Sequence, residues 1–128
     1  MTSIPESHRD LLDGEVVLAT NGTDGRPQVT AIVARVGDDG VLETSMNMTR
    51  QKVKNMLNDP RVTIFKADPQ ARMRTVEVRA DAEVIADPDK VWSRAFAAEL
   101  GFDIVGFDGP GEDRSRVRFH PVKVNTIG

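Results

Sequence analysis

Residues 15–36 read EVVLATNGTDGRPQVTAIVARV, two apolar runs separated by a polar turn. The first run, residues 15–20, is typical of a strand, and the Asn, Asp and Gly residues at 21–25 favour a hairpin. The second run, residues 28–36, carries apolar residues on both faces. Because a strand buried on both faces needs cover beyond its own sheet, we expect a helix, a partner subunit or a flat ligand over its second face.

The rest of the chain predicts further strands. Residues 75–85 alternate between polar and apolar residues, which indicates a long strand with one face in the core. Shorter strands are expected at 41–45, 61–67 and 114–124, and a brief helix at 5–12. Many strands joined by turns, with only two or three helices, predict a mainly β fold, a small antiparallel barrel with inserted helices.

Two helices are expected between these strands. The first spans residues 50–58 and has Thr49 as its N-cap. The second spans residues 88–100 and ends at Gly101. Residues 102–113 are expected to form a loop. The residues of the second helix that should face the core are Val91, Trp92, Ala95 and Ala98.

Composition limits the classes of function. The chain has 128 residues, which predicts one domain over residues 1–128, and its lack of cysteine excludes disulfides and thiol chemistry. We expect a cytoplasmic protein, because the N-terminus does not resemble a signal peptide and no apolar run is long enough to span a bilayer. A net charge of −3 and 5% aromatic residues argue against nucleic-acid or membrane partners. His8 and His120 lack metal-ligand spacing, so no metal site is expected.

A cluster of cations marks the start of the first expected helix. Arg50, Lys52 and Lys54 fall in its first turn and a half, where the helix already carries a partial positive charge. This placement is electrostatically unfavourable unless an anion binds there, and phosphate suits both the free amides and a guanidinium. The alternative is a solvated helix face whose cations keep the protein soluble. The residues alone therefore favour a phosphate-bearing ligand on a small barrel.

Several motifs in this order resemble the pyridoxamine 5′-phosphate oxidase-like split β-barrel superfamily. Within it, the chain is most similar to the actinobacterial flavin/deazaflavin oxidoreductases, many of which use coenzyme F420. The resemblance extends from about residue 11 to residue 124. The motifs that carry it are Leu18-Ala19-Thr20, Asp24-Gly25-Arg26-Pro27-Gln28, Ser45, Arg50-x-Lys52-x-Lys54-Asn55 and Asn58-Asp59-Pro60-Arg61-Val62.

The resemblance implies a homodimer with the cofactor in a groove between the subunits. Arg50 and Lys52 match positions that bind the cofactor phosphate, with Lys54 and Asn55 beside them. Ser45 matches a position at the end of the third strand, near the ring and its side chain. The strand that borders the ring system corresponds to Gln28, Val29 and Thr30.

The function expected from the resemblance is an oxidoreductase that transfers a hydride between coenzyme F420 and a small-molecule substrate. FMN is the alternative cofactor, because both molecules present a phosphate after a ribityl chain. A non-catalytic flavin or haem carrier on the same barrel is a further alternative. Oxidation of a vitamin B6 phosphate is not expected, because the sequence stops soon after the last strand. No side chain stands out as a general acid, so no catalytic residue is assigned.

Overall fold

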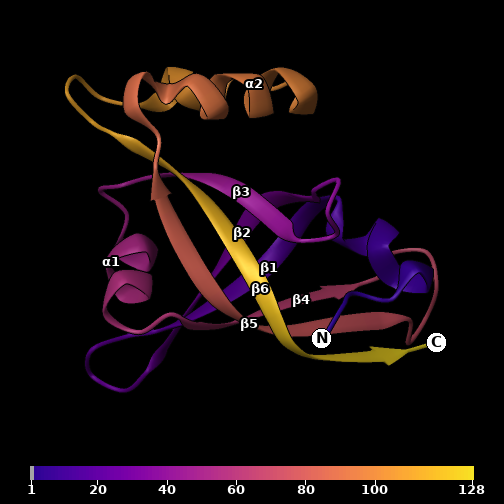
Figure 1. Ribbon diagram of the computed structural model, residues 1–128. Coiled ribbons are helices and arrows are strands. Elements are labelled where there is room, and N and C mark those ends of the chain that lie inside the picture. The colour runs from indigo at the N-terminus through magenta and orange to yellow at the C-terminus, as the bar shows by residue number, and fades with distance from the viewer. Residues whose placement is uncertain (1) are drawn as a thin grey trace.

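The computed structural model describes residues 2–128 as a six-stranded antiparallel barrel (Figure 1). Around the closed barrel the strands follow the order β1-β2-β3-β6-β5-β4. The mainly β fold predicted from the sequence is therefore confirmed. The strands are β1 (Gly14–Asn21), β2 (Pro27–Val36), β3 (Leu42–Asn47), β4 (Arg61–Ala67), β5 (Thr75–Ala86) and β6 (Arg114–Ile127).

Short helices connect the strands. The α-helices are α1 (Gln51–Asn58) and α2 (Val91–Leu100), and the 3-10 helices are η1 (Glu6–Leu12), η2 (Pro88–Lys90) and η3 (Ile104–Phe107). η3 lies within residues 102–113, which were expected to be a plain loop. None of the helices in residues 2–128 has the length and apolar character needed to cross a lipid bilayer.

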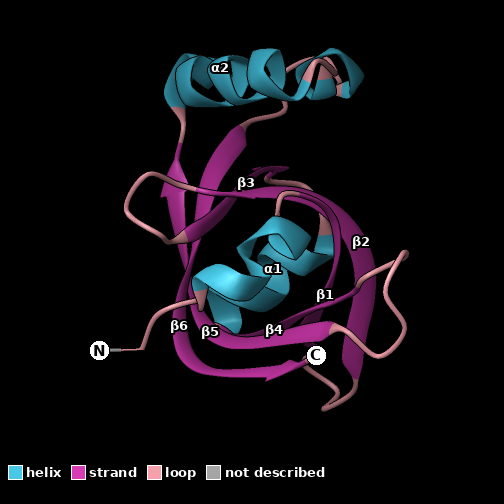
Figure 2. Cartoon of the chain, turned by 90° about the vertical axis from the view of Figure 1, so that its right-hand side faces the viewer, coloured by secondary structure: helices cyan, strands magenta, loops and turns pink. Residues whose placement is uncertain are grey.

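The core fills the barrel, and α1 contributes to it from one end. Inward residues of every strand form the core, among them Leu18, Ile64 and Phe119, all fully buried. Val53 and Met56 of α1 join the same cluster. Figure 2 shows α1 framed by the ring of strands. The first turn of α1 follows the end of β3 and lies near Ile32 and Val33, in the middle of β2.

The closed barrel is paired only over a short length between β2 and β3. Their ladder consists of the pairs Arg35–Glu43 and Val36–Leu42, whereas β3 pairs with β6 along its full length. Just beyond the last pair, the Thr44 hydroxyl donates a hydrogen bond of 2.6 Å to the Val33 carbonyl. Past this point the facing edges of the two strands separate, which leaves room for a cavity.

The structure corrects the expected start of the first helix. Arg50 is the N-cap residue of α1, in an extended conformation, and the helix begins at Gln51. Thr49 is not the cap, because its backbone N–H and its hydroxyl both donate to the Asn47 carboxamide oxygen, at 2.9 and 2.7 Å. Asn47 therefore organises the turn that leads from β3 into α1.

The second expected helix is broken, and it turns a different face inward. η2 precedes α2 directly, and its last two residues, Asp89 and Lys90, have positive φ. The expected Gly101 end is confirmed, with a left-handed conformation. Val91, Ala95 and Ala98 were expected to be buried, but they are exposed. The residues that face the barrel are Ser93, Phe96 and Ala97, with Trp92 partly buried.

Candidate functional site

A cavity of about 170 Å³ lies at the opening between β2 and β3. Its barrel side consists of Ile32, Val33 and the β3 residues 44–47, and the start of α1 adds Arg50 and Lys52. Its outer side comes from α2, η3 and the first residue of β6. Figure 1 shows α2 lying outside the barrel at this end of the molecule. The opening in the barrel is thus covered by a helical segment from the second half of the chain.

The cations at the start of α1 line this cavity, and the side chains that the structure describes include no ion-pair partner for them. Among residues 2–128, neither Arg50 nor Lys52 forms an ion pair. Burial lowers the pKa of the partly buried Lys52 ammonium, and the neighbouring Arg50 charge lowers it further. The Arg50 side chain forms no capping hydrogen bond with the helix. This end of the cavity therefore has positive charge and helix dipole that an anion would compensate.

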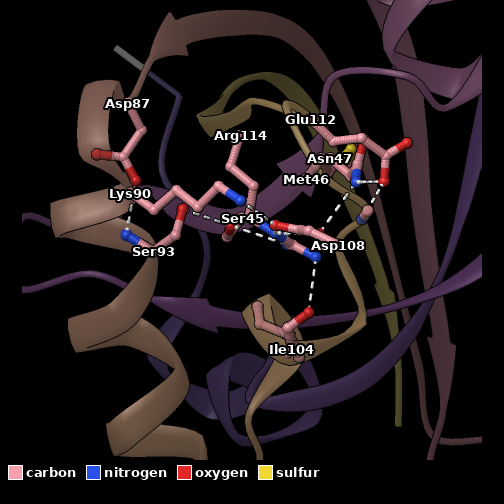
Figure 3. A network of polar contacts seen from close by, with 12 residues as sticks. Ser45, Met46, Asn47, Asp87, Lys90, Ser93, Ile104, Asp108, Glu112 and Arg114 are labelled. Carbon is pink, nitrogen blue, oxygen red and sulfur yellow. Dashed lines mark hydrogen bonds and ion pairs between the residues drawn. The ribbon is translucent and has the colours of Figure 1, made fainter.

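Arg114 lines the cavity, and its guanidinium donates hydrogen bonds to three residues (Figure 3). Its Nε donates to both carboxylate oxygens of Asp108, at 3.0 and 2.9 Å. Its Nη1 donates to the Ser45 hydroxyl at 3.1 Å, and its Nη2 donates to the Ile104 carbonyl at 2.8 Å. The contacts join β6 to β3 and η3, so Arg114 orders the cavity wall.

Asp108 is the anionic centre of this network. Besides Arg114, it accepts a hydrogen bond from the Asn47 amide at 3.0 Å and pairs with the Lys90 ammonium at 3.0 Å. Burial raises the pKa of Asp108, but the hydrogen bonds from Arg114, Lys90 and Asn47 outweigh that effect and lower it to about 2. Asp108 is therefore ionised at neutral pH and balances the buried Arg114 charge.

Ser45 connects the cavity to α2. Its hydroxyl donates a hydrogen bond of 2.7 Å to the Ser93 hydroxyl, and both residues are buried. The Asp87 carboxylate accepts from the backbone N–H groups of Trp92 and Ser93, at 3.1 and 2.7 Å, and so caps α2. Burial raises the pKa of Asp87, but the hydrogen bonds from Ser93 and Trp92 leave it below its ordinary value.

The residues predicted to bind a cofactor divide into separate groups. Ser45, Arg50 and Lys52 line the cavity together. Asn55 does not line it, because it is buried in an amide network instead. Its Nδ2 donates to the Thr20 hydroxyl at 3.0 Å and to Gln28 at 3.2 Å. Asn55 and Gln28 thus join α1 to the barrel wall.

The other three predicted residues also lie outside the cavity lining. Val29 is on the outer face of β2 and is 61% exposed. Thr30 shares the inner face of β2 with Ile32, and its hydroxyl oxygen is buried without a hydrogen-bond partner among the described residues. Lys54 is exposed on α1. The cavity therefore brings together one part of the predicted set.

Sequence reasoning missed the part of the site that comes from the second half of the chain. Phe96, Leu100, Ile104 and Arg114 line the cavity, and Asp108 holds Arg114 in place. Arginines alternate along the final strand at 114, 116 and 118, and the carboxylate partners of the last two, Glu43 and Asp39, are far away in the sequence. The described residues contain no group of three or more His, Asp or Glu side chains that could hold a metal ion.

Comparison with known proteins assigns the chain to a characterised fold. The family model for pyridoxamine 5′-phosphate oxidase matches residues 4–128. No curated protein shows significant similarity to the chain.

Solved structures share the whole architecture. A structure named F420 Reductase is 28% identical, with a TM-score of 0.79, and the match covers 95% of this chain and 98% of that one. The conserved hypothetical protein Rv2991 from Mycobacterium tuberculosis is 22% identical, with a TM-score of 0.70 and coverage of 97% and 84%. HutZ, the haem storage protein from Vibrio cholerae, is 17% identical, with a TM-score of 0.74 and coverage of 99% and 96%. The last two similarities establish the fold alone.

Proposed function

This chain belongs to the pyridoxamine 5′-phosphate oxidase family, and from that premise we propose that it is an F420-dependent oxidoreductase. The cavity between β2 and β3 would hold the coenzyme, whose deazaflavin ring would supply hydride-transfer chemistry toward a small-molecule substrate. The observation that carries the proposal is the pair of cations, Arg50 and Lys52, that line the cavity without an ion-pair partner in residues 2–128. A phosphate ester there would satisfy both charges and the first amides of α1.

The similarity to a structure named F420 Reductase favours F420 over FMN. FMN remains the second candidate, because its phosphate would suit the same cations. Haem carriage is less well supported. Haem iron is usually held by His, Cys, Met or Tyr, and among the described residues the cavity lining offers only Met46, which is also part of the core.

In this proposal the coenzyme supplies the hydride chemistry, and the protein positions and shields it. Arg50 and Lys52 hold the phosphate. Phe96, Leu100 and Ile104 exclude water from the outer side of the cavity. The described lining residues include no carboxylate and no histidine, and we assign no residue as the proton donor. Arg114 and Asp108 act by ordering the wall.

We also propose that a second copy of the chain completes the site. An apolar outer face extends over β1, β2 and β4 and includes Val17, Val29, Val33 and Phe65, which are 37–61% exposed. Val33 also lines the cavity, so a subunit packed on this face would lie beside the site. The cavity of one chain, about 170 Å³, is smaller than the roughly 300 Å³ of typical ligand pockets. A partner would enlarge it.

Fluorescence titration of the protein with F420 and with FMN tests the proposal. F420 should bind more tightly, and Lys52→Ala should weaken its binding by about 1–3 kcal/mol, as expected for a lost charged hydrogen bond. Lys123→Ala, an exposed position on β6, is the matched control and should leave the affinity unchanged. A preference for FMN would replace the cofactor assignment, and binding of neither compound would refute the proposal.

A further inference from the structure

The cavity has two chemically different ends. At one end, where α1 starts, the cavity carries the charges of the exposed Arg50 and the partly buried Lys52. Its outer wall, supplied by α2 and η3, consists of Phe96, Leu100 and Ile104. Every side chain that α2 and η3 contribute to the lining is therefore apolar.

The polar side chains in the rest of the lining are already hydrogen-bonded within the protein. The Ser45 hydroxyl donates to Ser93 and accepts from Arg114. The Asn47 amide donates to Asp108 and Glu112, and its oxygen accepts from Thr49. A charged ligand group near the outer wall would thus lose its water without gaining a new partner.

The remaining two polar residues of the lining are used in the same way. The Thr44 hydroxyl donates to the Val33 carbonyl. The Arg114 charge is balanced by the Asp108 carboxylate, and both side chains are almost fully buried, at 8% and 2% exposure. Burying a charge without a compensating partner is strongly unfavourable. The free charges of the cavity are those of Arg50 and Lys52 alone, among the residues that the structure describes.

We infer that the outer wall selects a substrate whose reacting part is uncharged and apolar, and that Leu100 determines this selectivity. The inference rests on the proposed function, in which the coenzyme phosphate occupies Arg50 and Lys52 and leaves the outer end for the substrate. Leu100 is the last residue of α2 and is partly exposed at the cavity, so a substitution there changes the wall without removing a buried core residue.

The experiment compares methyl cinnamate with cinnamate, which share a ring and a conjugated double bond but differ in charge. Binding is measured by calorimetry in two arms. In each arm the cations at positions 50 and 52 are either occupied or removed, so they cannot bind the cinnamate carboxylate. One arm uses the wild-type protein saturated with F420. The other uses the coenzyme-free Arg50→Ala/Lys52→Ala protein. In both arms the ester should bind at least about tenfold more tightly than the acid.

Two further variants locate the effect. Leu100→Lys should abolish the preference for the ester or reverse it, because it places an ammonium group at the outer wall. Val91→Lys adds the same charge to the same helix at a position that is 70% exposed and outside the lining, and it should keep the wild-type preference. Equal effects of the two lysines would overturn the assignment to Leu100.

The outcomes separate this inference from the proposed function. If F420 binds but the acid binds as well as the ester, or neither probe binds, the inference is wrong and the proposed function stands. If F420 does not bind but the coenzyme-free arm still prefers the ester, the proposed function is wrong and the selectivity of the wall is supported. A preference for the ester in both arms supports the two together.

Discussion

The Ser45 hydroxyl lies 2.7 Å from the Ser93 hydroxyl, and this buried hydrogen bond attaches α2 to β3 beside the cavity. Two other contacts between α2 and the barrel involve arginines of the barrel. The Arg116 guanidinium lies 4.8 Å from the Trp92 ring centre, and Arg35 pairs with Glu99. Phe96, although buried, is not part of the cluster that fills the barrel. α2 is therefore a separately packed cover over the opening.

A disulfide at this point should lock the cover in place. The chain has no cysteine, so Ser45→Cys/Ser93→Cys introduces the only two thiols, at positions whose side-chain oxygens are 2.7 Å apart. The disulfide would close the loop between positions 45 and 93, which are 48 residues apart. It should raise the free energy of unfolding by about 4 kcal/mol. Denaturant unfolding of the oxidised and reduced forms measures the difference.

The same double variant tests whether α2 must move to admit the coenzyme. We expect the oxidised form to bind F420 more slowly than the reduced form, and dithiothreitol to restore the rate. The comparison is made within one variant, so any effect of losing the serine hydroxyls cancels. Equal association rates in the two forms would show that α2 need not open.

Because of Asp108, the free energy of unfolding should decrease as the pH is lowered through the acidic range. Its pKa is lowered to about 2 in the folded state, below the ordinary carboxyl value of 3.8. Because the folded pKa is depressed, the stabilisation is complete above the unfolded value and is lost as pH falls toward about 2. It amounts to about 2 kcal/mol.

Asp108→Asn should remove this dependence and also leave Arg114 without its carboxylate. The measurement is the free energy of unfolding of both proteins between about pH 5 and 2. We expect the wild-type curve to fall more steeply than that of the variant. Asp24→Asn, at an exposed turn, is the control and should keep the wild-type slope. Parallel curves for wild type and Asp108→Asn would contradict the assignment.

The barrel could be predicted from the sequence because its signals are local. Alternation and hairpin turns identify the strands, and the closed arrangement follows from the need to cover their edges. The inward face of α2 could not be predicted in this way. Val91, Ala95 and Ala98 form an apolar stripe, but the Asp87 cap and the left-handed pair Asp89–Lys90 set the helix in another rotation.

In the candidate site, too, some residues could be predicted from a local sequence pattern and others could not. The cations at 50 and 52 were visible because their position at a helix start is electrostatically unusual. Arg114, by contrast, is one of several arginines in a strand, and only the folded chain brings it to Ser45 of β3, 69 positions away in the sequence. Long-range pairing of this kind leaves no local pattern in the sequence.

Because of Lys52, the affinity for anions should decrease as the pH is raised through the alkaline range. Burial and Arg50 lower its pKa, so the ammonium loses its proton at a lower pH than an ordinary lysine. Affinity for inorganic phosphate should therefore fall as pH rises through this lowered value. In Lys52→Arg the fall should disappear, because a guanidinium stays protonated throughout the range. Calorimetric titration with phosphate between about pH 7 and 10 measures it. An identical fall in Lys52→Arg would assign the titration to another group.

Two threonines on neighbouring strands should respond in opposite ways to the loss of their hydroxyl groups. The Thr30 hydroxyl is buried and has no hydrogen-bond partner within residues 2–128, whereas the Thr44 hydroxyl donates to the Val33 carbonyl at 2.6 Å. Thr30→Val should therefore raise the free energy of unfolding, by up to about 1 kcal/mol, and Thr44→Val should lower it by about 1 kcal/mol. Denaturant unfolding of the coenzyme-free protein measures both. Destabilisation by Thr30→Val would mean that its hydroxyl has a partner, such as a bound water, in the folded protein.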